Sequence, residues 1–394
     1  MTSTRSTPRV RALAPDLARG TMLAVIALAH SQVLARPFLG PAPAPGPAVD
    51  TVVQALLTLF VDSRGYPMFA ALFGYGMVQI LYRADGRTCK QVGGREPRLG
   101  WSGARRLLRR RAAWLVAFGF CHVLLLYPGD ILASYGVLAL LFVGALRWRN
   151  GRLLTVAAGT GVLGALVYGC VLALPAPVGD PAALPTDPLG SALHRLMAFP
   201  LLVPMNAVMA AAPLLVGIWA GRRRLLEEPE RHRTLLVRVA TAGITIAAVG
   251  AVPHALVTTG HWVPGTGVLV AAGSLHTAAG YAGGLGYAAL IGLVALRLTR
   301  PGTAPGPVAT ALAACGQRSM SCYLAQSVAW LLLLEPYLAG LTGALGVTAA
   351  AAVGLGIWLV TVVVADLARR ADRPGPAEAL LRRLTYRSQA DTRP

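Results

Sequence analysis

A histidine and an aspartate lie close together in a strongly apolar stretch, GFCHVLLLYPGDILASYG, residues 119–136. His122 precedes a Pro-Gly turn, and Asp130 follows that turn directly. A carboxylate beside an imidazole orients the ring and raises its basicity, which suits general-base attack on a hydroxyl or an amine. Asp130 is also well placed to cap the helix that follows, so a purely structural role for it stays open.

A second histidine shares its helix face with an arginine in ARGTMLAVIALAHS, residues 18–31. Arg19 and His30 are separated by about three helical turns, which puts them on one face and about 16 Å apart along the axis. This arrangement suits a channel that holds a long anionic donor. The alternative is that Arg19 extends to lipid headgroups while His30 hydrogen-bonds a neighbouring helix.

The elements that must position these residues are membrane helices. Of the 394 residues, 55% are hydrophobic and 13% charged, and the mean hydropathy is +0.58. These values predict an all-α, polytopic membrane helix bundle. The net charge of +20 comes from arginines bunched between apolar runs, which indicates topology signals in contact with a lipid bilayer and no nucleic-acid partner.

About ten transmembrane helices are expected, with both ends of the chain in the cytoplasm and a bacterial plasma membrane as the location. Arginine-rich connections alternate with Pro- and Gly-rich ones, as this orientation requires. The whole chain, 1–394, forms one integral membrane domain, with basic cytoplasmic tails at 1–16 and 369–394 and a basic loop at 83–111. Kinks are expected at GGLG, 283–286, and at CGQRSMSC, 315–322. The predicted spans are 17–35, 57–82, 112–127, 130–147, 152–174, 196–220, 235–255, 267–297, 308–335 and 343–368.

Further ionisable residues fall on the extracytoplasmic side of these spans, among them Asp62, Arg64 and His276. Ionisable groups inside spans are costly and usually face a bundle interior, so the set predicts a binding site. No metal site is expected, because the cysteines form no Cys-x-x-Cys pair and read as reduced packing residues. No phosphate-binding loop or hydrolase elbow is visible.

Several stretches resemble one family in the same order along the chain. FGFCHVLLLYPGDILASYGVLALL resembles the Gly-x-x-His and Gly-Asp-Ile-Leu signature of the YeiB-like bacterial membrane proteins, a family named for a domain of unknown function. FAALFGYGM, GIWAGRRRLL, CGQRSMSCYLAQS and the closing GPAEALLRRLTYRS agree as well. Ser321 and Cys322 replace the usual Thr-Asn, Ala377 replaces a leucine, and His30 stands where relatives tend to carry asparagine.

The resemblance implies a distant relation to the transmembrane acyltransferases. An acyl donor such as acetyl-CoA or another acyl-CoA would then approach from the cytoplasm, with no other cofactor firmly implied. His30 or His122 would activate an envelope hydroxyl or amine acceptor, for example on a cell-envelope glycan. Asp130 would orient His122. Substrate-binding candidates are Arg19, Arg64, Asp62, His276, Tyr323 and Gln326.

Two other functions remain open from the sequence. A small-solute transporter or permease would use the same buried polar residues as a binding site and proton relay. A non-catalytic membrane scaffold would need none of them. The acceptor, the acyl chain and the oligomeric state are not determined by the sequence.

Overall fold

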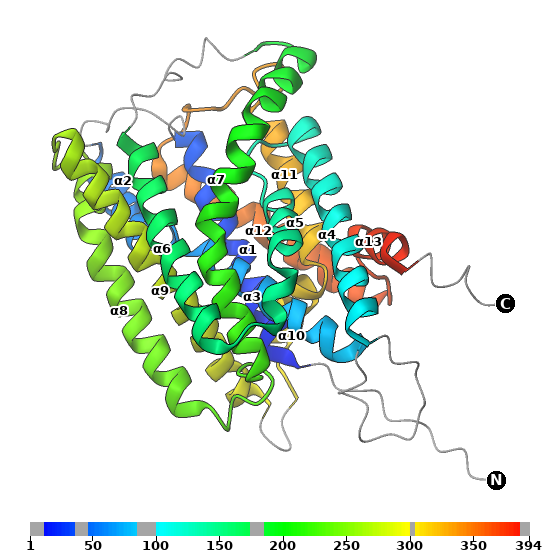
Figure 1. The fold of residues 1–394 in the computed structure, drawn as a ribbon. Coiled ribbons are helices and arrows are strands. Elements are labelled where there is room, and N and C mark those ends of the chain that lie inside the picture. The colour runs from blue at the N-terminus through cyan, green and yellow to red at the C-terminus, as the bar shows by residue number, and fades with distance from the viewer. Residues whose placement is uncertain (1–11, 36–45, 85–99, 174–184, 300–303, 387–394) are drawn as a thin grey trace, which may run out of the picture.

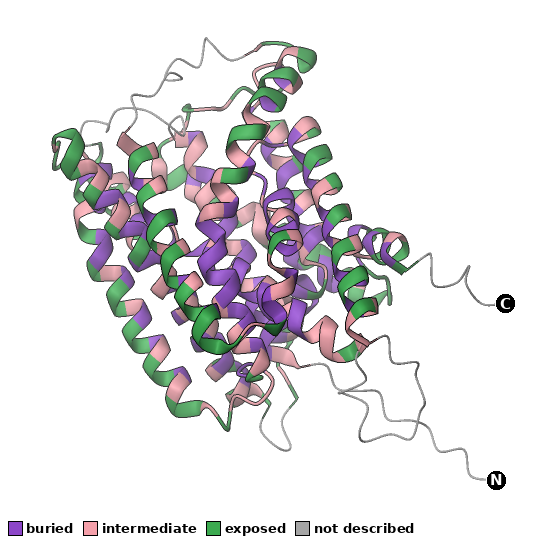
Figure 2. Ribbon diagram, viewed as in Figure 1, coloured by how far each residue is buried: buried purple, intermediate pink, exposed green. Residues whose placement is uncertain are grey.

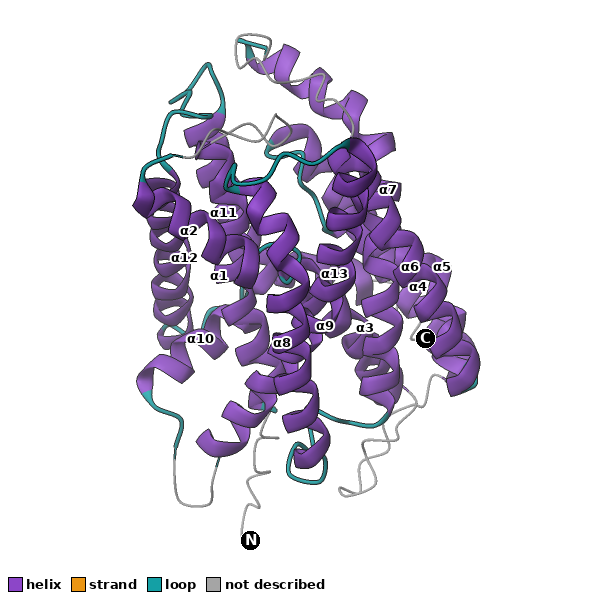
Figure 3. Ribbon diagram, turned by 90° about the vertical axis from the view of Figure 1, so that its left-hand side faces the viewer, coloured by secondary structure: helices purple, strands orange, loops and turns teal. Residues whose placement is uncertain are grey.

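A computed structural model describes residues 12–35, 46–84, 100–173, 185–299 and 304–386. These residues form a helix bundle, which confirms the predicted all-α membrane fold (Figure 1). In Figure 1 and Figure 3 the long helices run from end to end of the bundle, and most loops lie at its two ends. The helices are α1 Leu13–Ala35, α2 Ala48–Phe60, α3 Gly65–Ala84, α4 Gly100–Leu125, α5 Leu132–Phe142 continued by a 3₁₀ turn Val143–Arg147, α6 Asn150–Ala173, α7 Pro188–Arg222, α8 Arg233–Thr258, α9 Thr266–Leu298, α10 Pro307–Gln317, α11 Ser319–Leu334, α12 Val347–Arg370 and α13 Pro376–Tyr386.

Length and composition identify the membrane-crossing elements. Among the described residues, six helices are long and apolar enough to span a bilayer: α1, α6, α7, α8, α9 and α12. The 132–147 segment and α11 are shorter apolar helices. Only 22% of the most apolar part of α6 and of α12 is buried, so these helices present apolar side chains to the outside of the bundle. Figure 2 shows exposed residues along α6. Such a surface is stable in lipid, which solvates apolar groups.

The second predicted span, 57–82, is broken into α2 and α3. Residues 61–64 form the break, and Ser63 there has φ 58°. This segment packs directly against two glycines of α9. A Cβ at Gly280 would collide with the Ser63 carbonyl, and one at Gly284 would crowd the Arg64 carbonyl. No break occurs at 283–286, since α9 runs continuously through these residues, and its glycines Gly280 and Gly284 provide space for the neighbouring segment.

Three other boundaries test the predictions. The break expected within 315–322 is confirmed, since α10 ends at Gln317 and α11 begins at Ser319. The basic segment 83–111 is helical from Gly100 onward, because α4 extends well beyond the predicted span, and the predicted tail 369–394 contains α13. Residues 85–99 and 387–394 lie outside the described residues.

At two helix crossings, a pair of glycines lets the backbones of the two helices touch. Gly20 of α1 and Gly316 of α10 face each other's backbones, and a Cβ on either would overlap a carbonyl oxygen, of Leu312 or of Asp16. Gly74 of α3 and Gly217 of α7 make a similar crossing. Small residues at such points are typical of membrane bundles, where close van der Waals packing drives association.

The C-terminal helix caps α11. Glu378 Oε1 accepts the N–H groups of Met320 and Ser321 at 2.7 and 3.2 Å, and its Oε2 accepts the Ser321 hydroxyl at 2.5 Å. Ser321 Oγ in turn accepts the Ala377 N–H at 3.0 Å. Ser321, which stands where the resembling family usually has threonine, therefore both donates and accepts a hydrogen bond. These bonds connect α13 to the start of α11.

At the opposite end of the bundle, Asp50 of α2 caps α12. Its Oδ1 accepts the N–H and the hydroxyl of Thr348 at 3.0 and 2.5 Å, and its Oδ2 accepts the N–H of Val347 at 3.2 Å. These donors stabilise the ionised carboxylate at a helix N-terminus. Thr348 accordingly lowers the pKa of the Asp50 carboxyl from its usual value.

We expect Asp50→Asn to lower the melting temperature near neutral pH. Because the folded-state pKa is lower than the unfolded-state one, the stabilisation is present above the unfolded-state pKa, about 3.9, and is lost as the pH falls through the folded-state value. Thermal unfolding in detergent from neutral to acidic pH should show the wild type approaching the variant at the acidic end. Glu230→Gln, on an exposed loop, serves as the control. A gap that stays constant with pH would contradict the cap.

Candidate active site

A serine, a histidine and an aspartate form a chain of contacts inside the bundle. His122 Nε2 lies 2.8 Å from Ser327 Oγ, and His122 Nδ1 lies 3.0 Å from Asp130 Oδ1. All three residues are at most 2% exposed. The three side chains come from α4, from the turn before α5 and from α11. The geometry is that of a nucleophile, a base and a group that orients the base.

Local packing fixes the aspartate. Asp130 Oδ2 accepts the N–H of Ala133 at 2.6 Å, so the predicted capping role and the contact with His122 occur together. The first turn of α5 can approach α4 because Gly119 carries no side chain: a Cβ there would lie 2.5 Å from Asp130 Oδ2 and 2.6 Å from the Ala133 Cβ. The sequence GFCH therefore provides both the histidine and the space for its partner.

His30 lies next to this chain of contacts. Its ring is 4.8 Å from the Tyr127 ring and 6.4 Å from the Trp330 ring, centroid to centroid. Trp330 is about one turn beyond Ser327 on the same side of α11. His30 and His122 therefore both face α11 at neighbouring levels.

The two candidates on α11 face different helices. Tyr323 packs its ring 5.1 Å from the His122 ring and donates its hydroxyl to the Gly129 carbonyl at 3.0 Å. Gln326 instead donates to Thr361 Oγ1 of α12 at 3.4 Å. Tyr323 thus belongs with His122 and Asp130, whereas Gln326 lies on the α12 side of the helix.

Arg64 and His276 form a separate cluster at the break between α2 and α3. The Arg64 side chain is fully buried, and it donates to the carbonyls of Asp62 and of Ala247, the latter at 2.6 Å. Its Nη1 lies 3.4 Å from Nδ1 of His276, whose ring is 4.6 Å from that of His254. The ionisable residues that the sequence analysis grouped together therefore make their contacts in two clusters, one around His122 and one around Arg64.

A chain of hydrogen bonds extends from this second cluster. Gln32 donates to Asp62 Oδ1 at 2.5 Å and accepts from Gln54 at 3.1 Å. Gln54 also donates to Thr58 at 3.2 Å, and the Thr58 hydroxyl meets that of Thr258 at 3.0 Å. These contacts join α1, α2 and α8, and they give the cluster a structural role beside any binding role.

Arg19 lies at the far end of α1 from His30. Its guanidinium is 3.4 Å from Asp16 Oδ1 and faces Gly76 of α3, where a Cβ would lie 3.5 Å from Nη2. A short way further along α1, Met22 and Val25 help line an apolar cleft of about 210 Å³ between α1, α3 and α9.

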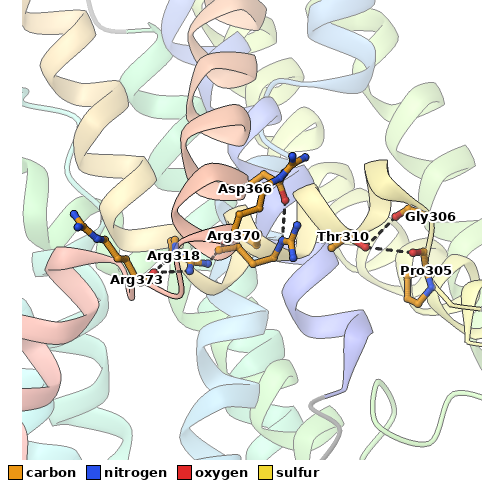
Figure 4. A network of polar contacts seen from close by, with 9 residues as sticks. Pro305, Gly306, Thr310, Arg318, Asp366, Arg370 and Arg373 are labelled. Carbon is orange, nitrogen blue, oxygen red and sulfur yellow. Dashed lines mark hydrogen bonds and ion pairs between the residues drawn. The ribbon is translucent and has the colours of Figure 1, made fainter.

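More arginines gather near this end of α1, because α10 packs against it. Arg318, at the α10–α11 break, donates to the Arg373 carbonyl at 3.1 and 2.5 Å (Figure 4). Asp366 near the end of α12 pairs with Arg369 and Arg370, each at 2.8 Å. The basic residues thus lie together at one end of the molecule, although they come from distant parts of the sequence.

Ser327 is the site residue that the sequence prediction missed. It closes the block CGQRSMSCYLAQS, four residues after Tyr323. Residues at this spacing share a helix face, so a role for Tyr323 beside His122 could have drawn attention to Ser327. Serine is common in membrane helices because it packs well between them. A serine in such a helix therefore does not by itself indicate a catalytic role.

Comparisons with known proteins give one family match and several similar, uncharacterized proteins. Residues 220–388 match the model of a family described as "Protein of unknown function (DUF418)". The chain is similar to the uncharacterized protein YxaH of Bacillus subtilis (strain 168), with 24% identity over 365 residues, which cover 86% of this chain and 83% of YxaH. An uncharacterized 39.9 kDa protein from the amylase 3' region of Bacillus acidopullulyticus is 29% identical over 190 residues, 48% of this chain and 40% of that protein.

The uncharacterized protein YeiB of Escherichia coli (strain K12) is 32% identical over 103 residues, 26% of this chain and 20% of YeiB. The break at Arg318, the α11 block and the Glu378 cap all fall within the DUF418 match. The comparisons confirm the predicted resemblance: the chain is similar to YeiB and to YxaH, and its residues 220–388 match the DUF418 model.

Proposed function

We propose that this protein is a membrane-embedded acyltransferase that moves an acyl group from a cytoplasmic donor such as acetyl-CoA to an extracytoplasmic hydroxyl or amine. The observation that carries the proposal is the buried His122–Asp130 pair at 3.0 Å. A neutral imidazole held by a carboxylate is suited to remove a proton from such an acceptor. Enclosure by α4, α5 and α11 keeps water from competing for the acyl group.

The distribution of charge supports the direction of transfer. Arg19, Arg318, Arg369 and Arg370 lie at one end of the bundle, and the proposed orientation puts this end in the cytoplasm of a bacterium, at its plasma membrane. Coenzyme A carries phosphates that arginines bind well. His30 and His122 lie further along the helices, toward the opposite side. A donor bound at the arginine end would direct its thioester toward the histidines.

We expect acetyl-CoA to stabilise the purified protein against heat, and Arg19→Ala to remove this effect. A ligand that binds the native state at a hundred times its dissociation constant stabilises it by about 2.7 kcal/mol. The measurement is the melting temperature in detergent with and without acetyl-CoA. Arg231→Ala, an arginine that is 78% exposed, is the matched control and should keep the shift. His122→Ala should also keep it, because the imidazole transfers protons and does not bind the donor's phosphates.

An equal shift in Arg19→Ala would place the donor elsewhere. No shift at millimolar acetyl-CoA, with other acyl-CoA donors equally without effect, would argue against the acyltransferase.

The decisive test of the activity is acceptor-dependent release of coenzyme A. The protein, reconstituted in nanodiscs so that both faces are accessible, would receive acetyl-CoA together with amino sugars or hydroxyl-bearing envelope glycans. A thiol assay would follow the donor, and mass spectrometry would follow the acetylated acceptor. Product formation that requires His122 supports the proposal. Donor binding without acceptor-dependent turnover over the whole panel would count against it.

One observation favours a second candidate, a small-solute transporter. The α2–α3 break brings the fully buried Arg64 against His276, and broken helices with buried charges form substrate sites in many transporters. Uptake assays in proteoliposomes distinguish the two functions. A transporter would need Arg64 for solute flux and tolerate His122→Ala, whereas the acyltransferase would show the reverse dependence on His122.

A further inference from the structure

We propose that Ser327 is the nucleophile that carries the acyl group between donor and acceptor. This inference rests on the proposed acyltransferase function and assigns its mechanism: transfer in two steps through an ester on this chain, in place of direct transfer. The structural basis is the contact of 2.8 Å between Ser327 Oγ and His122 Nε2, on the side of the ring away from Asp130.

The position of Asp130 indicates which nitrogen of His122 is free to act. Asp130 Oδ2 accepts the Ala133 N–H at 2.6 Å, and Oδ1 lies 3.0 Å from His122 Nδ1. A carboxylate that already accepts a backbone N–H is best satisfied by a second donor, so Nδ1 carries the proton in the neutral ring. Nε2 is then an acceptor, and the hydroxyl of Ser327 is the donor within its reach.

Ser327 also has a partner when the ring is protonated. Its Oγ lies 3.2 Å from the Tyr323 carbonyl. In the neutral state the hydroxyl donates to Nε2. When the imidazole holds a second proton, Nε2–H donates to Oγ and the hydroxyl turns to the carbonyl. The Ser327 hydroxyl therefore has a hydrogen-bond partner in both protonation states of His122.

The chemistry balances with acyl-CoA as the donor. Ser327 Oγ attacks the thioester carbonyl carbon while its proton passes to His122 Nε2. The C–S bond breaks, and the leaving thiolate takes the proton from the imidazole, which releases free coenzyme A and leaves an O-acyl serine. The acceptor hydroxyl or amine then attacks this ester. His122 removes the acceptor's proton and returns it to Ser327 Oγ as the C–O bond breaks.

A structural role alone would give different results. If Ser327 only satisfied the imidazole, its loss would remove one buried hydrogen bond and leave His122 able to activate the acceptor directly. Covalent attachment of the acyl group separates the two cases, because packing produces no ester. Ser134 is a matched control, since it is also a fully buried helix serine but donates to the Val203 carbonyl at 3.2 Å.

The experiment is intact-protein mass spectrometry after incubation of the purified protein with acetyl-CoA in the absence of acceptor. The wild type and Ser134→Ala should gain the mass of one acetyl group, which peptide mapping places on Ser327 and hydroxylamine removes. Ser327→Ala should gain none, and its acceptor-dependent release of coenzyme A should fall at least about a hundredfold. Ser327→Cys should again be acylated, as a thioester, which shows that the site is folded.

Two failures are distinguishable. If wild type and Ser327→Ala transfer acetyl groups to the acceptor at similar rates, and neither forms an ester, direct transfer is the mechanism and the nucleophile inference is wrong while the acyltransferase stands. If the wild type neither becomes acylated nor transfers the group with short- or long-chain acyl-CoA, the proposed function fails and this inference fails with it.

Discussion

Replacing His122 by alanine should lower acceptor-dependent acyl transfer by about 10²–10⁴-fold, the usual contribution of a positioned general base. The ring contacts both Ser327 and Asp130, so its loss removes the proton acceptor of either half-reaction. The measurement is coenzyme A release with acceptor present, at saturating donor. The loss should appear in kcat, because the imidazole does not bind the donor's phosphates.

Stability has to be separated from chemistry in this variant. His122→Ala leaves a buried carboxylate without its partner, which destabilises proteins strongly. His122→Asn is the second variant, because its amide can donate to Asp130 but cannot exchange a proton as an imidazole does. It should fold better than the alanine variant and still be inactive. His261→Ala, on the exposed turn after α8, should keep full activity. Activity in the asparagine variant would refute the base assignment.

The largest effect on folding is expected for Gly316→Ala at the crossing of α10 and α1. A Cβ there would overlap the carbonyl group of Asp16, which belongs to the backbone and cannot turn aside. Overpacked sites usually cost 1–3 kcal/mol, and we expect about 3 kcal/mol or more here because α1 and α10 would have to separate. A melting temperature in detergent, together with the monodisperse fraction on size exclusion, measures this loss.

Gly159→Ala is the matched control. This glycine lies within α6, and a Cβ added there would have no atom of a neighbouring element within 4 Å. Alanine has a higher helix propensity than glycine, so stability should stay the same or rise. Similar losses in the two variants would mean that glycine content, and not the α1–α10 contact, limits the fold.

The membrane architecture was accessible from the sequence because its physical cause is local. A run of apolar residues prefers lipid wherever it occurs, and its backbone can satisfy its hydrogen bonds only as a helix. The spans at 17–35, 152–174 and 235–255 each correspond to one described helix, α1, α6 and α8. The break at Arg318 was also visible, since CGQRSMSC interrupts an apolar run with polar residues and a glycine.

Other helix boundaries depend on partners far away in the sequence. The α2–α3 break contains the polar residues Asp62, Ser63 and Arg64, and it is accommodated by Gly280 and Gly284 of α9. The same dependence bears on residues 283–286, where α9 is continuous. Glycines there weaken the helix locally, but the packed segment around Arg64 fills the space that they leave. A hydropathy profile does not show that these glycines pack against residues 63 and 64, because it averages over neighbours in sequence.

The site divides in the same way. The sequence by itself determined that the chain is a membrane helix bundle. It also placed His122 and Asp130 close together across a short Pro-Gly turn, so that they could pair, and the structure shows the contact at 3.0 Å. Only the tertiary structure decided that Ser327, 205 residues from His122, completes the contact, and that Arg64 and His276 lie in a cluster of their own. Helix faces are fixed by the 3.6-residue repeat, but which face meets which is set by close packing across the whole bundle.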